Sequence, residues 1–128
     1  MIGSVLWSRL GRREAAKAVA AILLDVEVGW IRLYPAAGLA EVAIRPADPV
    51  TEATIAMAGW CATRAANDVR EAVRLVGEVG MREAADRALG LLAGRGPLLA
   101  AVVQAAMARD GEELDGTTVT AMVRAALA

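Results

Sequence analysis

The segment from Asp48 to Val76 constrains the fold most, because it has the pattern of one long, packed helix. Asp48 can accept hydrogen bonds from the free amides of a first helical turn, and Pro49 suits the first helical position. Small and apolar residues then recur at steps of four and three, which lines one face of a helix: Ile55, Gly59, Ala62, Ala66, Val69, Val73 and Val76. We predict a helix over residues 48–76, about 42 Å long, which Asn67 and Asp68 could split by capping a second helix.

The side chains available for a core also favour helices. Hydrophobic residues make up 57% of the 128 residues, aromatic residues only 3%, and phenylalanine is absent. Alanine, the strongest helix former, is abundant. We therefore predict one domain, residues 1–128, that is mainly α-helical, with four to six helices around the long one. A core with so few large side chains is a candidate for completion by a partner.

One segment has the pattern of a β-hairpin. Val28 and Trp30 belong to an alternating run rich in β-branched and aromatic residues, and a second alternating run ends before Pro46, which cannot donate to a strand. We predict a hairpin over residues 26–45, so that the fold is α+β at most. Further helices are predicted over residues 12–24, 81–93, 97–109 and 117–127, the apolar 97–109 helix being the most central. We expect a shared core of Ile55, Val69, Val73, Leu99 and Val102, with Arg64, Arg70 and Glu83 in solvent.

The residue types that most catalytic and metal sites need are absent or isolated. Histidine is absent and Cys61 is the single cysteine, which excludes nucleophile–histidine pairs and cysteine-based zinc sites within one chain. Glu112, Glu113 and Asp115 lie in an acidic loop that lacks the alternating ligands of a calcium loop. We predict no catalytic residue, no metal and no cofactor. A small enzyme with a carboxylate and arginine site formed in an oligomer is an alternative.

Charge argues against nucleic acid as a partner. The formal net charge is −1, so no overall field attracts the chain to a phosphate backbone. The C-terminal segment resembles the second half of a helix-turn-helix, but Thr117, Thr118 and Ala121 occupy positions where base-reading side chains are needed. We expect a capped terminal helix, and keep a small helix-turn-helix-like DNA-binding regulator as an alternative.

The N-terminal segment has a basic start and an apolar run, which is the outline of a secretory signal. Lys17 interrupts the run, and Asp25 and Glu27 follow too soon for a cleavage site. No window of about 20 residues is free of charge, as a membrane span would require. We expect a cytoplasmic protein without a membrane segment.

Aromatic and arginine side chains are the candidates for binding a partner. The six residues that we select are Trp7, Trp30, Tyr34, Arg64, Arg70 and Arg74. A small core accommodates at most one or two of the three tryptophans, so we expect a homo-oligomer whose contact involves the hairpin, through Trp30 or its edge strand, and residues 1–8. The alternative is a monomer in which Trp7 folds back. For the arginines, the alternative is a solvated face compensated by Asp68 and Glu71.

One local pattern has a family resemblance. Val42-Ala-Ile-Arg45-Pro46, followed by a helix start at Asp48 and an alanine-rich run to Ala58, resembles small tail-assembly chaperones of tailed bacteriophages and phage-like elements. The resemblance covers residues 26–66. It implies a hairpin leading into a helical domain that binds the tape-measure protein without catalysis. We therefore expect a non-enzymatic interaction or assembly protein, with phage morphogenesis as its most specific form.

Overall fold

The computed structural model describes the backbone of residues 2–34 and 38–128, and the side chains from Arg9 onward within those ranges. The chain is mainly α-helical with one hairpin, as predicted. The helices are α1 (Ile2–Leu23), α2 (Pro49–Thr63), α3 (Ala66–Leu92), α4 (Gly96–Ala108) and α5 (Gly116–Leu127), and the strands are β1 (Val28–Tyr34), β2 (Leu39–Ile44) and β3 (Leu114–Asp115).

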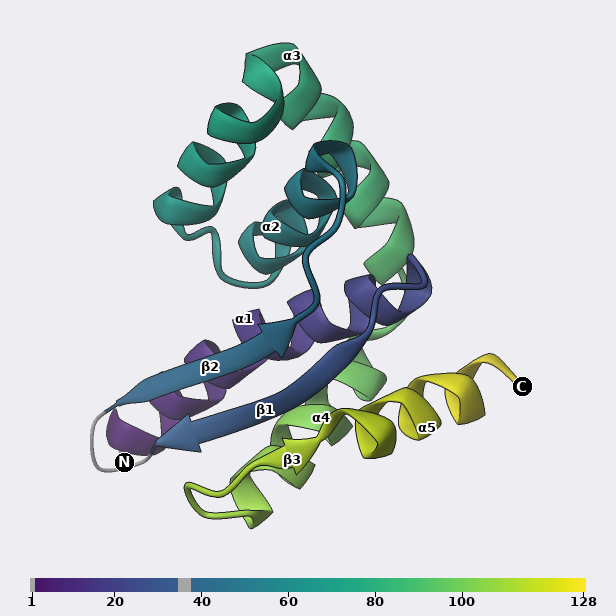
Figure 1. Ribbon diagram of the computed structural model, residues 1–128. Helices are drawn as coiled ribbons and strands as arrows, with labels where there is room; N and C mark the ends of the chain where they lie inside the picture. The colour runs from purple at the N-terminus through teal and green to yellow at the C-terminus, as the bar shows by residue number, and fades with distance from the viewer. Residues whose placement is uncertain (1, 35–37) are drawn as a thin grey trace.

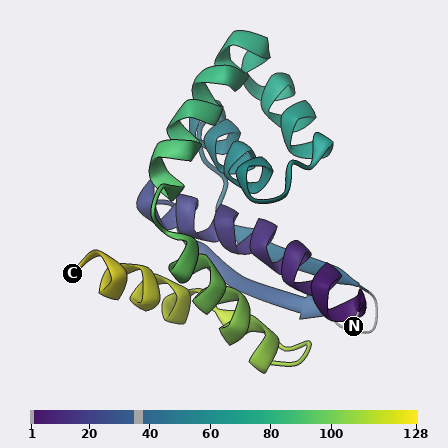
Figure 2. The same ribbon diagram turned by 180° about the vertical axis from the view of Figure 1, so that it is seen from behind.

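The strands form a three-stranded antiparallel sheet in the order β2-β1-β3. Figure 1 shows β1 and β2 in front of α1, and Figure 2, from behind, shows α1 and α4 in front of the strands. The helices therefore cover one face of the sheet, and in the part of the chain that the structure describes no helix covers the other. We refer to this second face as the open face. The third strand was not predicted: the end of the acidic loop pairs with β1 and places Leu114 opposite Ile31.

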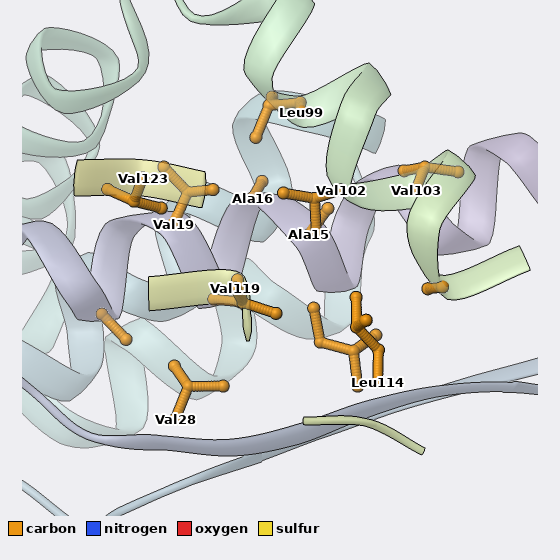
Figure 3. Close-up of a cluster of buried hydrophobic side chains, with 14 of the residues drawn as sticks. Ala15, Ala16, Val19, Val28, Leu99, Val102, Val103, Leu114, Val119 and Val123 are labelled. Carbon is orange, nitrogen blue, oxygen red and sulfur yellow. The ribbon is translucent and has the colours of Figure 1, made fainter. Parts of the chain in front are cut away.

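Helix α1, and not the segment 48–76 or the 97–109 helix, is the centre of the fold. Its Ala15, Ala16 and Val19 lie in one buried cluster with Val28 of β1 and Val102 of α4 (Figure 3). Small side chains on α1 let the sheet, α4 and α5 approach it closely. A second cluster joins α1, through Ala20, to α2 and to both halves of α3; its other members are Ala53, Met57, Ala58, Ala72, Ala84 and Ala88.

The predicted single helix over residues 48–76 is wrong, because the chain turns between two helices. Arg64 adopts left-handed dihedrals (φ 59°, ψ 30°) and ends α2, and α3 starts after Ala65, whose side chain makes no capping hydrogen bond. Neither Asn67 nor Asp68 is the cap. The start was predicted correctly: the carboxylate of Asp48 accepts hydrogen bonds from the amide and hydroxyl of Thr51, at 3.0 and 2.7 Å.

Three other predicted boundaries also change. The first helix begins at Ile2 and not at residue 12. The helix predicted over residues 81–93 is the second half of α3, after a kink where Gly77 has φ 77° and ψ 177°. The last helix begins at Gly116, one residue before the predicted start, and Asp115 caps it.

The predicted core forms only in part. Ile55, Leu99 and Val102 are buried together, whereas Val69 is half-buried against the second cluster and Val73 is half-buried. The predicted exposure of Arg64, Arg70 and Glu83 is confirmed.

Within the described residues no single helix is both long and apolar enough to cross a membrane. Helices α3 and α4 meet the same criteria of length and composition only as a pair, bent by 84° at the break between them.

Candidate protein-binding face

Alternation along β1 divides its side chains between the core and the open face. Ile31 and Leu33 are buried beneath the helices, each 1% exposed. Trp30, Arg32 and Tyr34 project from the opposite side and are half-buried. Two predicted binding residues, Trp30 and Tyr34, are therefore brought to one surface by a strand that the helices fix from behind.

Arg32 links the two aromatic rings into one array. Its guanidinium carbon lies 5.4 Å from the centre of the Trp30 ring and 5.6 Å from that of Tyr34, within the range of cation–π attraction. Its Nη1 donates to the Tyr34 hydroxyl at 3.0 Å, and its Nη2 pairs with Glu113 at 2.9 Å. These contacts hold the three side chains in defined positions before any partner arrives, which lowers the entropy cost of binding.

Carboxylates surround this array. Glu41 of β2 lies opposite Arg32 in the strand register and accepts a hydrogen bond from the Tyr34 hydroxyl at 3.4 Å. On the other side, Asp115 of β3 lies opposite Trp30, and Glu113 precedes that strand. Arg32 is thus set among three carboxylates. Arg109 and Glu112 line the same surface and offset each other in charge, so the open face carries a net negative charge around its aromatic centre.

The predicted arginines lie elsewhere and contact their own neighbours. The guanidinium carbon of Arg64 is 4.1 Å from the centre of the Trp60 ring. Arg70 donates to the side chain of Asn67, and Arg74 donates twice to Glu71, at 3.0 and 2.6 Å. The structure does not bring these arginines to the open face. The side chain of Trp7 lies outside the described residues.

In the alternative interpretation Asp68 compensates these arginines on a solvated face, but it is buried between α1 and α3. It is 2% exposed. Its carboxylate accepts two hydrogen bonds from the guanidinium of Arg13, at 2.6 and 2.8 Å, and lies 3.2 Å from the ammonium of Lys17. Glu14 next to it is also buried, and burial is the main cause that raises the pKa of Glu14. Each carboxylate in this cluster faces a cation of the same chain, so the cluster joins helices.

No group of three or more histidine, cysteine, aspartate and glutamate residues is arranged to hold a metal ion among the residues that the structure describes. The pocket beside Lys17 is lined by Glu52 and Glu71 but not by the buried Glu14. The carboxyl group with the raised pKa therefore does not face that pocket.

Arg32 and Glu113 were not among the predicted site residues. The alternation of β1 could have identified Arg32, since it lies between Trp30 and Tyr34 on the same face. Glu113 could not be identified in this way, because it reaches Arg32 only through the pairing of β3 with β1, 81 residues along the chain. Comparisons with models of protein families, with curated proteins and with solved structures gave no match.

Proposed function

We propose that the chain is a non-enzymatic interaction protein that binds a protein partner through its open face. The observation that carries this proposal is the array of Trp30, Arg32 and Tyr34, held by Glu113 and turned away from the core. Tryptophan, tyrosine and arginine are the residue types most enriched among those that dominate binding energy at protein interfaces.

The chemistry of the open face favours a partner with cationic and apolar side chains. The rings supply contact area, and the carboxylates around them attract positive charge. The same carboxylates repel the phosphates of nucleic acid, so the DNA-binding alternative receives no support from this surface. The start of α5 also argues against DNA binding. The carboxylate of Asp115 caps this end of the helix, where a base-reading helix presents hydrogen-bond donors.

The most specific form of this proposal is an assembly factor of a phage or phage-like particle. Its support is the resemblance of residues 26–66 to tail-assembly chaperones, together with a hairpin that leads directly into α2. In this form the partner is a tape-measure-type protein, and the open face binds one of its cationic segments.

Co-expression with the protein encoded immediately downstream tests the proposal. We expect the two proteins to elute together in size-exclusion chromatography, and salt to weaken the complex because the face is acidic. The double variant Tyr34→Ala, Glu41→Arg is expected to raise the dissociation constant at least about tenfold, since it removes a ring and reverses a charge at the same surface.

The matched control is Arg70→Ala, Arg74→Ala, which changes the other predicted surface and is expected to leave the complex intact. A complex that is weakened by the control but not by the open-face variant would move the interface to α3. Absence of a complex, together with binding to duplex DNA that falls steeply with salt, would support the regulator instead.

A further inference from the structure

The second half of α3 exposes a regular row of side chains on the side opposite the core. Ala84 and Ala88 are fully buried against α2. On the other side of the same helix, Val79, Arg82, Asp86 and Leu89 are all exposed, with 71% of Val79 and 47% of Leu89 accessible to solvent. Their spacing of three, four and three residues is that of the contact positions in a coiled coil. We call these four residues the α3 seam.

An apolar groove borders the α3 seam. It has a volume of about 580 Å³ and lies between α2 and α3, and its walls include Leu89 and both charged residues of the seam. The remaining walls are almost entirely apolar: Met57, Trp60, Val69, Met81 and Ala85. Methionine has a flexible side chain and tryptophan a large one, and both are common at protein interfaces. The seam and the groove thus form one continuous surface with exposed apolar side chains.

The two charges of the α3 seam make no ion pair with each other or with another group in the described part of the chain. Both lie two residues from Ala84, on either side, and Val79 and Leu89 both lie five residues from it. Consider a second α3 that packs antiparallel against the α3 seam, related by a two-fold axis that crosses the seam at the level of Ala84. Arg82 then lies opposite Asp86 of the second copy. The same axis places Val79 opposite Leu89 of the second copy.

We propose that the chain forms a two-fold dimer through the α3 seam, with the apolar groove buried at its edge. Two-fold contacts are self-complementary by necessity, and this row is apolar at both ends with opposite charges in the middle. The dimer would complete a core that is poor in large side chains and would cover Trp60. The surface differs from the hairpin and residues 1–8, which were the expected contact. It is also separate from the open face, so the proposal does not depend on the proposed function.

Sedimentation velocity at micromolar concentration tests the dimer. We expect the unchanged chain to sediment as a dimer. Arg82→Glu and Asp86→Arg are each expected to raise the dissociation constant at least about tenfold, since each creates like-charge pairs at two symmetric places. Neither side chain has an ion-pair partner in the described chain, so both variants are expected to keep the melting temperature of the monomer.

Mixing the two single variants gives the decisive result. In the Arg82→Glu chain both charges of the α3 seam are negative, and in the Asp86→Arg chain both are positive. Every charge pair between the two chains is therefore attractive, and a heterodimer is expected to form. The control Glu83→Arg changes charge next to the seam and is expected to leave the dimer intact. A monomeric unchanged chain overturns the proposal, and so does a dimer that neither reversal weakens.

Discussion

Replacement of Gly116 by alanine is expected to lower the free energy of unfolding by about 3 kcal/mol, the upper end of what added atoms cost in a packed interior. An alanine Cβ at this position would lie 1.7 Å from the carbonyl oxygen of Val28 and 2.9 Å from that of Gly29. Both are backbone atoms of β1, the central strand, so no side-chain rotation can relieve the overlap. Either α5 moves away from the sheet or β1 bends, and each change exposes the cluster around Val119 and Val123.

Urea denaturation followed by circular dichroism measures this loss. Gly90→Ala is the matched control, because Gly90 is helical and its added Cβ has no atom within 4 Å apart from its chain neighbours and the backbone of its own helix. That change is expected to stabilise the chain by about 0.5–1 kcal/mol, through the higher helix propensity of alanine. If Gly116→Ala is as stable as the unchanged chain, α5 does not dock against β1 in solution.

Features with local causes were predictable from the sequence. The hairpin follows from alternation over a few residues, and the start of α2 follows from Asp48 and Pro49, whose effect reaches only one helical turn. The break at Gly77 has the same character, since glycine tolerates a positive φ that other residues avoid.

Features that depend on distant residues were not predictable. The regular spacing of small and apolar residues shows no break at Arg64 and Ala65. The chain nevertheless turns there, which lets α2 and α3 pack against each other in the second cluster. Arg64 takes up the turn in a left-handed conformation that no local pattern indicates for arginine. The candidate site divides in the same way: alternation brings Trp30 and Tyr34 to one face, whereas Glu113 joins them only because β3 pairs with β1.

The buried contact between α1 and α3 was hidden for the same reason. In the sequence Asp68 stands among charged residues of α3 that are exposed, but in the fold its carboxylate contacts Arg13 and Lys17 of α1. Gly59 of α2 leaves the space for this contact, since a Cβ there would lie 2.6 Å from the Lys17 side chain and 2.9 Å from the Asp68 carboxylate. Three helices therefore meet at one carboxylate.

The pH dependence of this contact has a definite sign. Burial by itself raises the pKa of Asp68, but the hydrogen bonds and charges of Arg13 and Lys17 together outweigh it and lower the pKa below 3.8. The folded chain thus binds a proton on Asp68 less readily than the unfolded chain does. The stabilisation from Asp68 is complete above the pKa that this carboxyl group has in the unfolded chain. It is lost as the pH falls through the pKa of Asp68 in the folded chain. Glu14 has the opposite effect on stability, because its pKa in the folded chain is raised above 4.5 and the folded chain therefore binds a proton on Glu14 more readily than the unfolded chain does.

Asp68→Asn is expected to lower the free energy of unfolding by about 3 kcal/mol at pH 7. This is the lower end for breaking a buried ion pair, because the side chains of Arg13 and Lys17 remain 25% and 18% exposed and can recover some hydration. Urea denaturation in a Glu14→Gln background, which removes the second buried carboxylate, is expected to show a constant difference above about pH 5 and a shrinking one below about pH 4.

Glu71→Gln supplies the comparison for Asp68→Asn on the same helix. It breaks the exposed pair with Arg74, and pairs of this kind contribute up to about 0.5 kcal/mol. Since both substitutions remove one negative charge from α3, the difference between them isolates the effect of burial. Equal losses at pH 7 would mean that water reaches Asp68 in solution, and that α3 is held to α1 by its apolar contacts alone.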